Sequence, residues 1–79
     1  MRLKMLAKDR ESGRSGCMTM YEDTDNPAMM VVQARRAGRR ARAQMANLRL
    51  GEVAGLIPAE TVIRAAREYL DAHPGAGQL

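Results

Sequence analysis

The segment CMTMYEDTDNPAMMVVQ, residues 17–33, decides the fold that this sequence favours. Residues 17–21 are typical of a short β-strand, and residues 28–33 form a second run rich in methionine and valine. Residues 22–27, between these runs, contain the Asx residues and the proline that are typical of a turn. The segment therefore predicts a β-hairpin with a loop of about six residues.

The second strand of this hairpin is apolar on both of its faces. Met29 and Val31 point to one face, and Met30 and Val32 point to the other. A sheet covered by helices on one side needs only one apolar face, so the second face requires another cover. A second copy of the chain is the simplest cover. We therefore expect an obligate dimer, with an interface formed by Met18, Met20, Met30 and Val32.

The elements that follow the hairpin complete a small α+β domain. Residues 34–48 have the apolar spacing of a helix, and residues 52–57 are typical of a third strand that ends at Pro58. An amphipathic helix is predicted over residues 59–72, before the stop signal at residues 73–75. The predicted fold is a three-stranded antiparallel sheet with two helices, in the order strand, strand, helix, strand, helix.

The predicted domain organisation is a single small domain with loose ends. Residues 1–16 are charged and rich in serine and glycine, which predicts a flexible basic arm, and residues 73–79 predict a flexible tail. Residues 17–72 then have to supply the core, without any tryptophan or phenylalanine. A domain of this size buries only about 60% of the surface of its unfolded chain, so self-association would add needed stability.

The net charge of +4 is concentrated in one part of the chain. Six arginines lie within residues 35–49, and residues 26–51 contain no acidic residue. Guanidinium groups form bidentate, permanently charged contacts with phosphates and carboxylates. Three kinds of partner suit these arginines: a polyanion, an acidic protein surface or the chain's own acidic hairpin. The fourth alternative is that the arginines only form a solvent-exposed surface without a partner. The candidate binding residues are Arg35, Arg36, Arg39, Arg40, Arg42 and Arg49.

Catalytic, metal-binding and membrane functions find little support in the sequence. Cys17 is the only cysteine, which excludes an intramolecular disulfide and a Cys-based zinc site, and we expect a buried structural thiol. The acidic turn lacks the glycine and the final glutamate of a calcium loop. His73 is expected at a helix end as a capping or dipole partner. We therefore expect a non-enzymatic cytoplasmic protein without a cofactor, a metal or a membrane-spanning segment.

Several short motifs resemble a known family. Residues 16–21, Val31-Val32-Gln33, Gly51-Glu52 and residues 57–60 are similar to the BldB-like proteins, very small actinobacterial proteins linked to development and antibiotic regulation. The similarity covers about residues 16–70, with Met18 and Ala34 where the family pattern has proline and glycine. The resemblance implies a cytoplasmic, homo-oligomeric regulator without catalytic activity, and it transfers no site residues.

Together these observations predict a small non-enzymatic regulator that acts as a homodimer through protein–protein contacts, in transcriptional or developmental control. The first alternative is direct binding of DNA through an arginine-rich helix within residues 35–49. The second alternative is an antitoxin-like or inhibitory partner protein whose flexible N-terminal arm folds onto its target.

Overall fold

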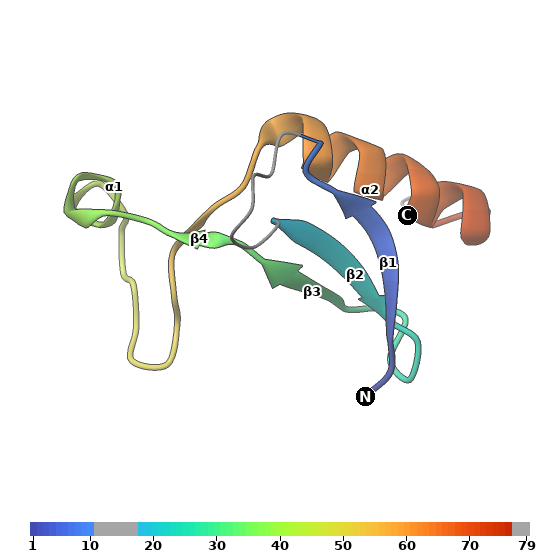
Figure 1. The fold of residues 1–79 in the computed structure, drawn as a ribbon. Coiled ribbons are helices and arrows are strands. Elements are labelled where there is room, and N and C mark those ends of the chain that lie inside the picture. Colours follow the sequence, from blue (N-terminus) through green and yellow to red (C-terminus); the bar gives the residue numbers. More distant parts are fainter. Residues whose placement is uncertain (11–17, 77–79) are drawn as a thin grey trace.

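A three-stranded antiparallel sheet and one long helix form the body of the molecule. The computed structural model describes residues 1–10 and 18–76. The sheet contains β1 (Leu3–Lys8), β2 (Thr19–Asp23) and β3 (Met30–Gln33), with β2 in the centre. Helix α2 (Ala59–Ala72) packs against β1 and β2 on one face of the sheet (Figure 1). The predicted α+β class, with a three-stranded antiparallel sheet and two helices, is confirmed.

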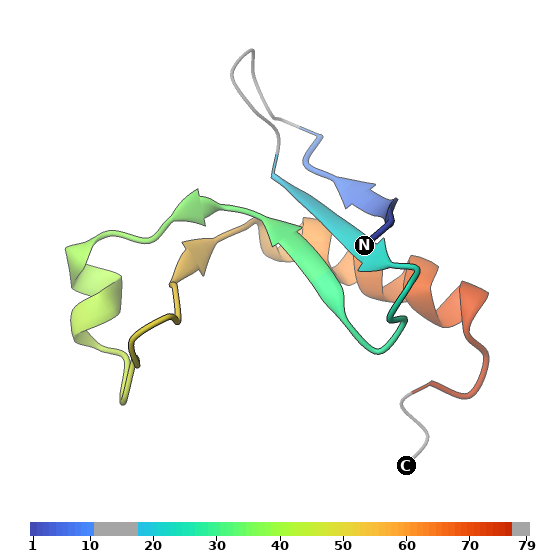
Figure 2. The same ribbon diagram turned by 90° about the horizontal axis from the view of Figure 1, so that it is seen from below.

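A second unit extends away from this body. Strands β4 (Arg35–Arg36) and β5 (Gly55–Leu56) pair as a two-stranded antiparallel ribbon, and α1 (Arg39–Ala43) lies beyond them. Figures 1 and 2 show this unit projecting from the sheet on the side opposite the C-terminal end of α2. We call residues 35–56 the arginine arm. The arm explains why the radius of gyration is 13.9 Å, whereas a compact domain of this length has about 11.6 Å.

The predicted hairpin is confirmed, with its turn shifted by two residues. The backbone N–H of Asp25 donates to Oδ1 of Asp23 at 3.0 Å, and the N–H of Asn26 donates to the carbonyl of Asp23 at 3.0 Å. The first of these bonds is an Asx turn, which Asp favours because its short side chain reaches the backbone two residues on. The turn chemistry therefore fixes the register in which Tyr21 faces Val31.

The prediction of a flexible arm over residues 1–16 is wrong for Leu3–Lys8, which forms the edge strand β1. An irregularity in the ladder between Met5 and Ala7 lets Leu6 and Ala7 both become buried. The prediction failed because Lys4 and Lys8 give this segment the charged composition of a loop. Leu3, Met5 and Ala7 nevertheless alternate with other residues as in a strand. Residues 11–16 of the predicted arm lie outside the described residues, as do Cys17 and residues 77–79.

The prediction of a helix over residues 34–48 is also wrong, because only Arg39–Ala43 is helical. Residues 35–36 are extended and pair with Gly55–Leu56, so the predicted third strand at residues 52–57 is shorter and belongs to the arm. A Cβ atom added to Gly55 would lie 3.0 Å from the Cβ of Ala34, so the close approach of the two chains requires a glycine. This long-range pairing replaces the helix that the local spacing predicted.

The final helix is confirmed over Ala59–Ala72, and it closes the core. Leu6, Ala7, Met20 and Ala65 form the buried cluster, and Met30, Ile57 and Tyr69 pack around it. Pro58 precedes the first turn of the helix, where a missing N–H has no cost. At the other end, His73 is the C-cap residue, and its N–H donates to the carbonyl of Tyr69. His73 therefore lies at the end of the helix as predicted, and its imidazole contacts Glu22.

The two faces of the sheet differ in what covers them. Residues that face each other across antiparallel strands share one face, so Met20 lies with Val32, and Glu22 lies with Met30, on the side of α2. Only 7% of Met20 is exposed, and Met30 packs against the core. Met20 is therefore buried within the chain itself, and Met30 is partly buried against the same core, which leaves little of either side chain for the predicted dimer interface.

The other two residues of that predicted interface also lie away from the open face. Val32 is on the helix side but remains exposed, because α2 packs over β1 and β2 and not over β3. Met18 is half-buried in a hollow of about 310 Å³ beside Leu56, Ile57 and Pro58. The opposite face of the sheet, away from α2, carries Leu3, Met5, Tyr21 and Val31 together with the polar residues Thr19, Asp23 and Gln33.

Candidate binding surface on the arginine arm

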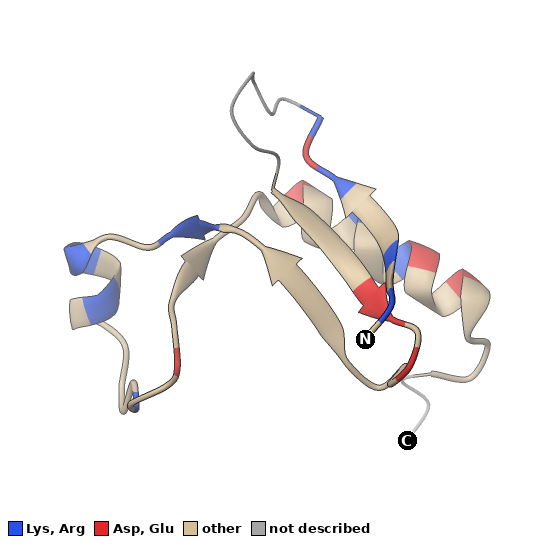
Figure 3. Cartoon of the chain, turned by 60° about the horizontal axis from the view of Figure 1, so that its bottom comes forward, with Lys and Arg blue, Asp and Glu red and all other residues tan. Residues whose placement is uncertain are grey.

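The arginine arm collects all six of the arginines that the sequence singles out. Arg35 and Arg36 lie on β4, the next three lie on α1, and Arg49 lies in the loop that returns to β5. All six are exposed. Glu52 is the only acidic residue of the arm, so six positive charges and one negative charge give it a net charge of +5. Figure 3 shows this concentration of basic residues at one end of the molecule.

The charges of the arm have no partners within the described parts of the chain. The ion pairs found in residues 1–10 and 18–76 all belong to the body: Arg10 and Arg64 with Glu60, the terminal amine with Asp25, and His73 with Glu22. The acidic turn between β2 and β3 lies at the opposite end of the sheet (Figure 3). The alternative in which the chain's own acidic hairpin neutralises these arginines within one subunit is therefore wrong.

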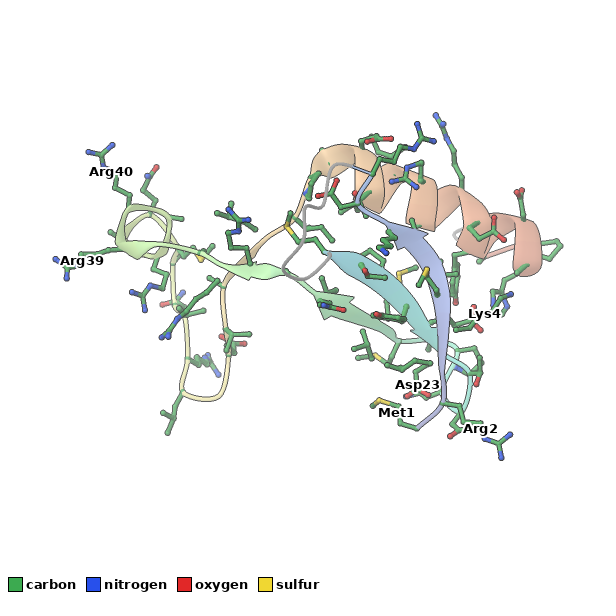
Figure 4. The ribbon with its side chains drawn as sticks, viewed as in Figure 1. Met1, Arg2, Lys4, Asp23, Arg39 and Arg40 are labelled. Carbon is green, nitrogen blue, oxygen red and sulfur yellow. The ribbon has the colours of Figure 1, made fainter. Side chains whose placement is uncertain are left out.

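The arginines of the arm have two different settings. In Figure 4, Arg39 and Arg40 at the start of α1 point away from the rest of the molecule into solvent. Arg36 and Arg42 instead line a hollow of about 400 Å³ together with Leu48, Glu52, Val53 and Ala54. The spacing of residues along the sequence gave no sign of this division. The division results from the pairing of β4 with β5. The N–H of Ala37 donates to the carbonyl of Ala54 and extends this pairing.

A tight turn shapes the far end of the arm. The N–H of Glu52 donates to the carbonyl of Arg49 at 3.0 Å, and Gly51 has a φ of 90°, as in the third position of a type II turn. The carboxylate of Glu52 in turn accepts the N–H of Arg49 at 2.8 Å. These two bonds hold residues 49–52 as a closed loop. Leu50, at the second position of the turn, therefore projects into solvent with its side chain fully exposed.

Apolar residues of the arm belong to the candidate surface, and the sequence did not assign them to it. Leu50 is 105% exposed and Val53 is 91% exposed, and Met45 and Leu48 are nearly half exposed. The sequence had predicted a helix over residues 34–48, which includes Met45 and Leu48, and a strand over residues 52–57, which includes Val53. Gly51 is the sequence signal for the exposed position of Leu50, because glycine readily adopts the positive φ that the third position of a type II turn requires.

A second cluster of polar side chains lies outside the arm and has a structural role. Nε2 of His73 lies 2.7 Å from Oε1 of the buried Glu22, and the ring of His73 stacks on Tyr69 with centroids 4.4 Å apart. The hydroxyl of Tyr69 donates to the carbonyl of Pro27. These contacts fasten the C-terminal end of α2 to β2 and to the turn that follows it.

Comparison with known proteins adds no relationship, since no family model, curated protein or solved structure matches this chain. In the described ranges, neither helix has the length and apolar character needed to cross a membrane.

Proposed function

We propose that this protein is a small, non-enzymatic regulatory protein of the cytoplasm that works as a homodimer and binds an acidic protein partner through its arginine arm. The observation that carries this proposal is the combination of unpaired guanidinium groups with exposed apolar side chains on one surface. A nucleic-acid backbone complements the charges of such a surface, but it has no apolar groups that would bury the exposed side chains of Leu50 and Val53. An acidic protein surface complements both.

The composition of the arm agrees with the composition of protein interfaces. Arginine and methionine are enriched in interfaces because they combine apolar contact area with charge or adaptability. Apolar side chains that stand together in water are typical of contact sites. The arm also contains no aromatic residue, which removes the stacking contacts on which single-stranded nucleic acids depend.

The exposed surface of the chain supports the homodimer. The chain exposes 6498 Å², whereas a compact monomer of 8.7 kDa exposes roughly 4,700 Å². A stable interface removes about 800 Å² from each partner. The uncovered face of the sheet, with Met5, Tyr21 and Val31, is the surface that a second copy would cover.

A pull-down from native cytosol tests the proposal. Bait protein is compared with a variant in which all six arginines of the arm are changed to serine, with and without nuclease treatment. We expect a protein partner that the wild-type chain retains after nuclease treatment and that the serine variant does not retain. Capture that disappears on nuclease treatment would contradict the proposal and would favour binding of nucleic acid.

Direct binding of DNA is the second candidate function, favoured by six guanidinium groups without carboxylate partners among the described residues. Anisotropy of labelled duplex DNA at about 50 and 200 mM salt separates it from the first, because binding by several phosphate contacts weakens steeply with salt. The antitoxin-like alternative requires a flexible N-terminal arm that folds onto a target. Leu3–Lys8 does not supply such an arm, because this segment is a strand of the sheet.

A further inference from the structure

The hollow on the arginine arm, lined by Arg36 and Arg42, has a shape and charge that favour one kind of partner side chain. The inference drawn from it rests on the proposed function. We infer that this hollow is an anchor site for an apolar side chain that lies next to a carboxylate on the partner. Its lining comes from β4, α1 and the loop before β5, so three parts of the arm converge on it. Its volume of about 400 Å³ lies within the range of roughly 300–1,000 Å³ that is usual for ligand sites.

The charged part of the lining favours a carboxylate. Arg36 and Arg42 contribute two guanidinium groups, and Glu52 contributes one carboxylate, which leaves a net charge of +1. One oxygen of Glu52 already accepts the backbone N–H of Arg49 at 2.8 Å. Neither guanidinium group makes an ion pair within residues 1–10 and 18–76. An entering carboxylate would receive the paired N–H donors that arginine presents in a fixed fork.

The apolar part of the lining favours an aliphatic or aromatic side chain beside that carboxylate. Leu48, Val53 and Ala54 form this wall. Val53 is 91% exposed in the free chain, so nearly all of its apolar surface is available to be buried by a partner. Residues that fill a well-packed pocket near the centre of an interface, arginine among them, contribute most of its binding energy.

A nucleotide fits the same hollow less well. Its phosphate would suit the two arginines, but its base would need a flat or aromatic neighbour, and the two tyrosines of the chain lie on β2 and α2, in the body. The wall of the hollow is aliphatic instead. Nucleic acid is therefore a competing outcome in the experiment and is not the occupant that we infer.

Fluorescence anisotropy with two labelled peptides tests the inference on the full chain. The first is a short peptide in which glutamate alternates with leucine, and the second has serine in place of every leucine. Both carry the same charge, so a difference between them reports the apolar wall. We expect the leucine peptide to bind about tenfold more tightly than the serine peptide, a typical effect of losing an apolar anchor. We expect Val53→Ser to abolish most of this difference.

Two matched double variants test the role of position. R36A/R42A removes the arginines that line the hollow, and R39A/R40A removes the same charge from arginines that point into solvent. We expect the first to weaken binding of the leucine peptide about tenfold and the second by about threefold or less. Circular dichroism controls for folding, and neither pair contacts the core of the body.

Three results would overturn the inference: equal affinity for the two peptides, equal loss in the two double variants, or no binding of the leucine peptide at low salt. The first two would leave the proposed function intact, because the arm would still bind acidic partners by charge alone. Labelled duplex DNA that binds more tightly than either peptide would instead overturn the proposed function. The peptide and DNA arms of the experiment therefore separate the two failures.

Discussion

A single buried hydroxyl gives the sharpest test of the core at the scale of the residue. Thr61 is fully buried in the first turn of α2, and its Oγ1 has no hydrogen-bond partner among the described residues. A buried polar group without a partner costs about 1–3 kcal/mol. Thr61→Val keeps the shape and removes the hydroxyl, so we expect it to raise the free energy of unfolding by about 1 kcal/mol in urea denaturation.

The matched control for this prediction is Thr61→Ser, which keeps the hydroxyl and removes a methyl group. We expect it to lower the free energy of unfolding by about 1 kcal/mol, because it leaves a small void in a packed site. If valine lowered stability instead, the hydroxyl of Thr61 would have a partner that compensates its burial.

The contact between His73 and Glu22 is a second residue-scale determinant of stability. Glu22 is 5% exposed, and its carboxylate lies 2.7 Å from the imidazole. His73→Ala leaves that carboxylate buried without this partner, so we expect a loss of about 1–3 kcal/mol in the free energy of unfolding. A double-mutant cycle with Glu22→Gln measures the coupling between the two side chains. Additive losses in the cycle would mean that the contact contributes nothing and that His73 acts only through its stacking on Tyr69.

At the scale of the element, the arm and the body differ in how they are stabilised. The body has a buried cluster, whereas α1 has only five residues and none of them is buried. A helix this short does not persist by itself, so the β4–β5 pairing and the turn at residues 49–52 hold the arm together.

The turn at Gly51 therefore offers a variant that alters the arm alone. Its φ of 90° lies in the region that disfavours a side chain, and an added Cβ would meet no atom within 4 Å. Gly51→Ala costs about 1 kcal/mol of local backbone strain. We expect weaker binding of the acidic peptide by about threefold to fivefold, with no change in the Tm of the body measured by circular dichroism. A lower Tm would show that arm and body unfold as one cooperative unit.

The same contrast explains which elements the sequence predicted. Helix α2 and the β2–β3 hairpin are specified by local signals: an apolar stripe between Pro58 and His73, and an Asx turn at Asp23. The arm depends on contacts between residues about twenty positions apart, such as Arg36 with Gly55, which no local pattern encodes. The six arginines were therefore predictable as a charged surface, but the hollow between Arg36 and Arg42 was not.

At the scale of the whole molecule, the uncovered face of the sheet determines how two copies would meet. Leu3, Met5, Tyr21 and Val31 share this face, and Tyr21 donates a hydrogen bond to Gln33 across it. A sheet with one face on its own helix and apolar side chains exposed on the second face is more stable when those side chains are also covered. The proposed interface is thus on the side opposite to the one that the sequence indicated.

Two substitutions distinguish these faces. Met5→Glu places a charge on the uncovered face, and Val32→Glu places the same charge on an exposed position of the helix side. Wild-type protein is expected to be a dimer by size-exclusion chromatography with light scattering at micromolar concentration. We expect Met5→Glu to give a monomer, because a buried unpaired carboxylate costs several kcal/mol in an interface. Val32→Glu is expected to remain dimeric, since Val32 does not lie on the proposed contact face. A monomeric wild type, or a dimer broken by Val32→Glu alone, would contradict this assignment and would leave the open face as a site for another protein.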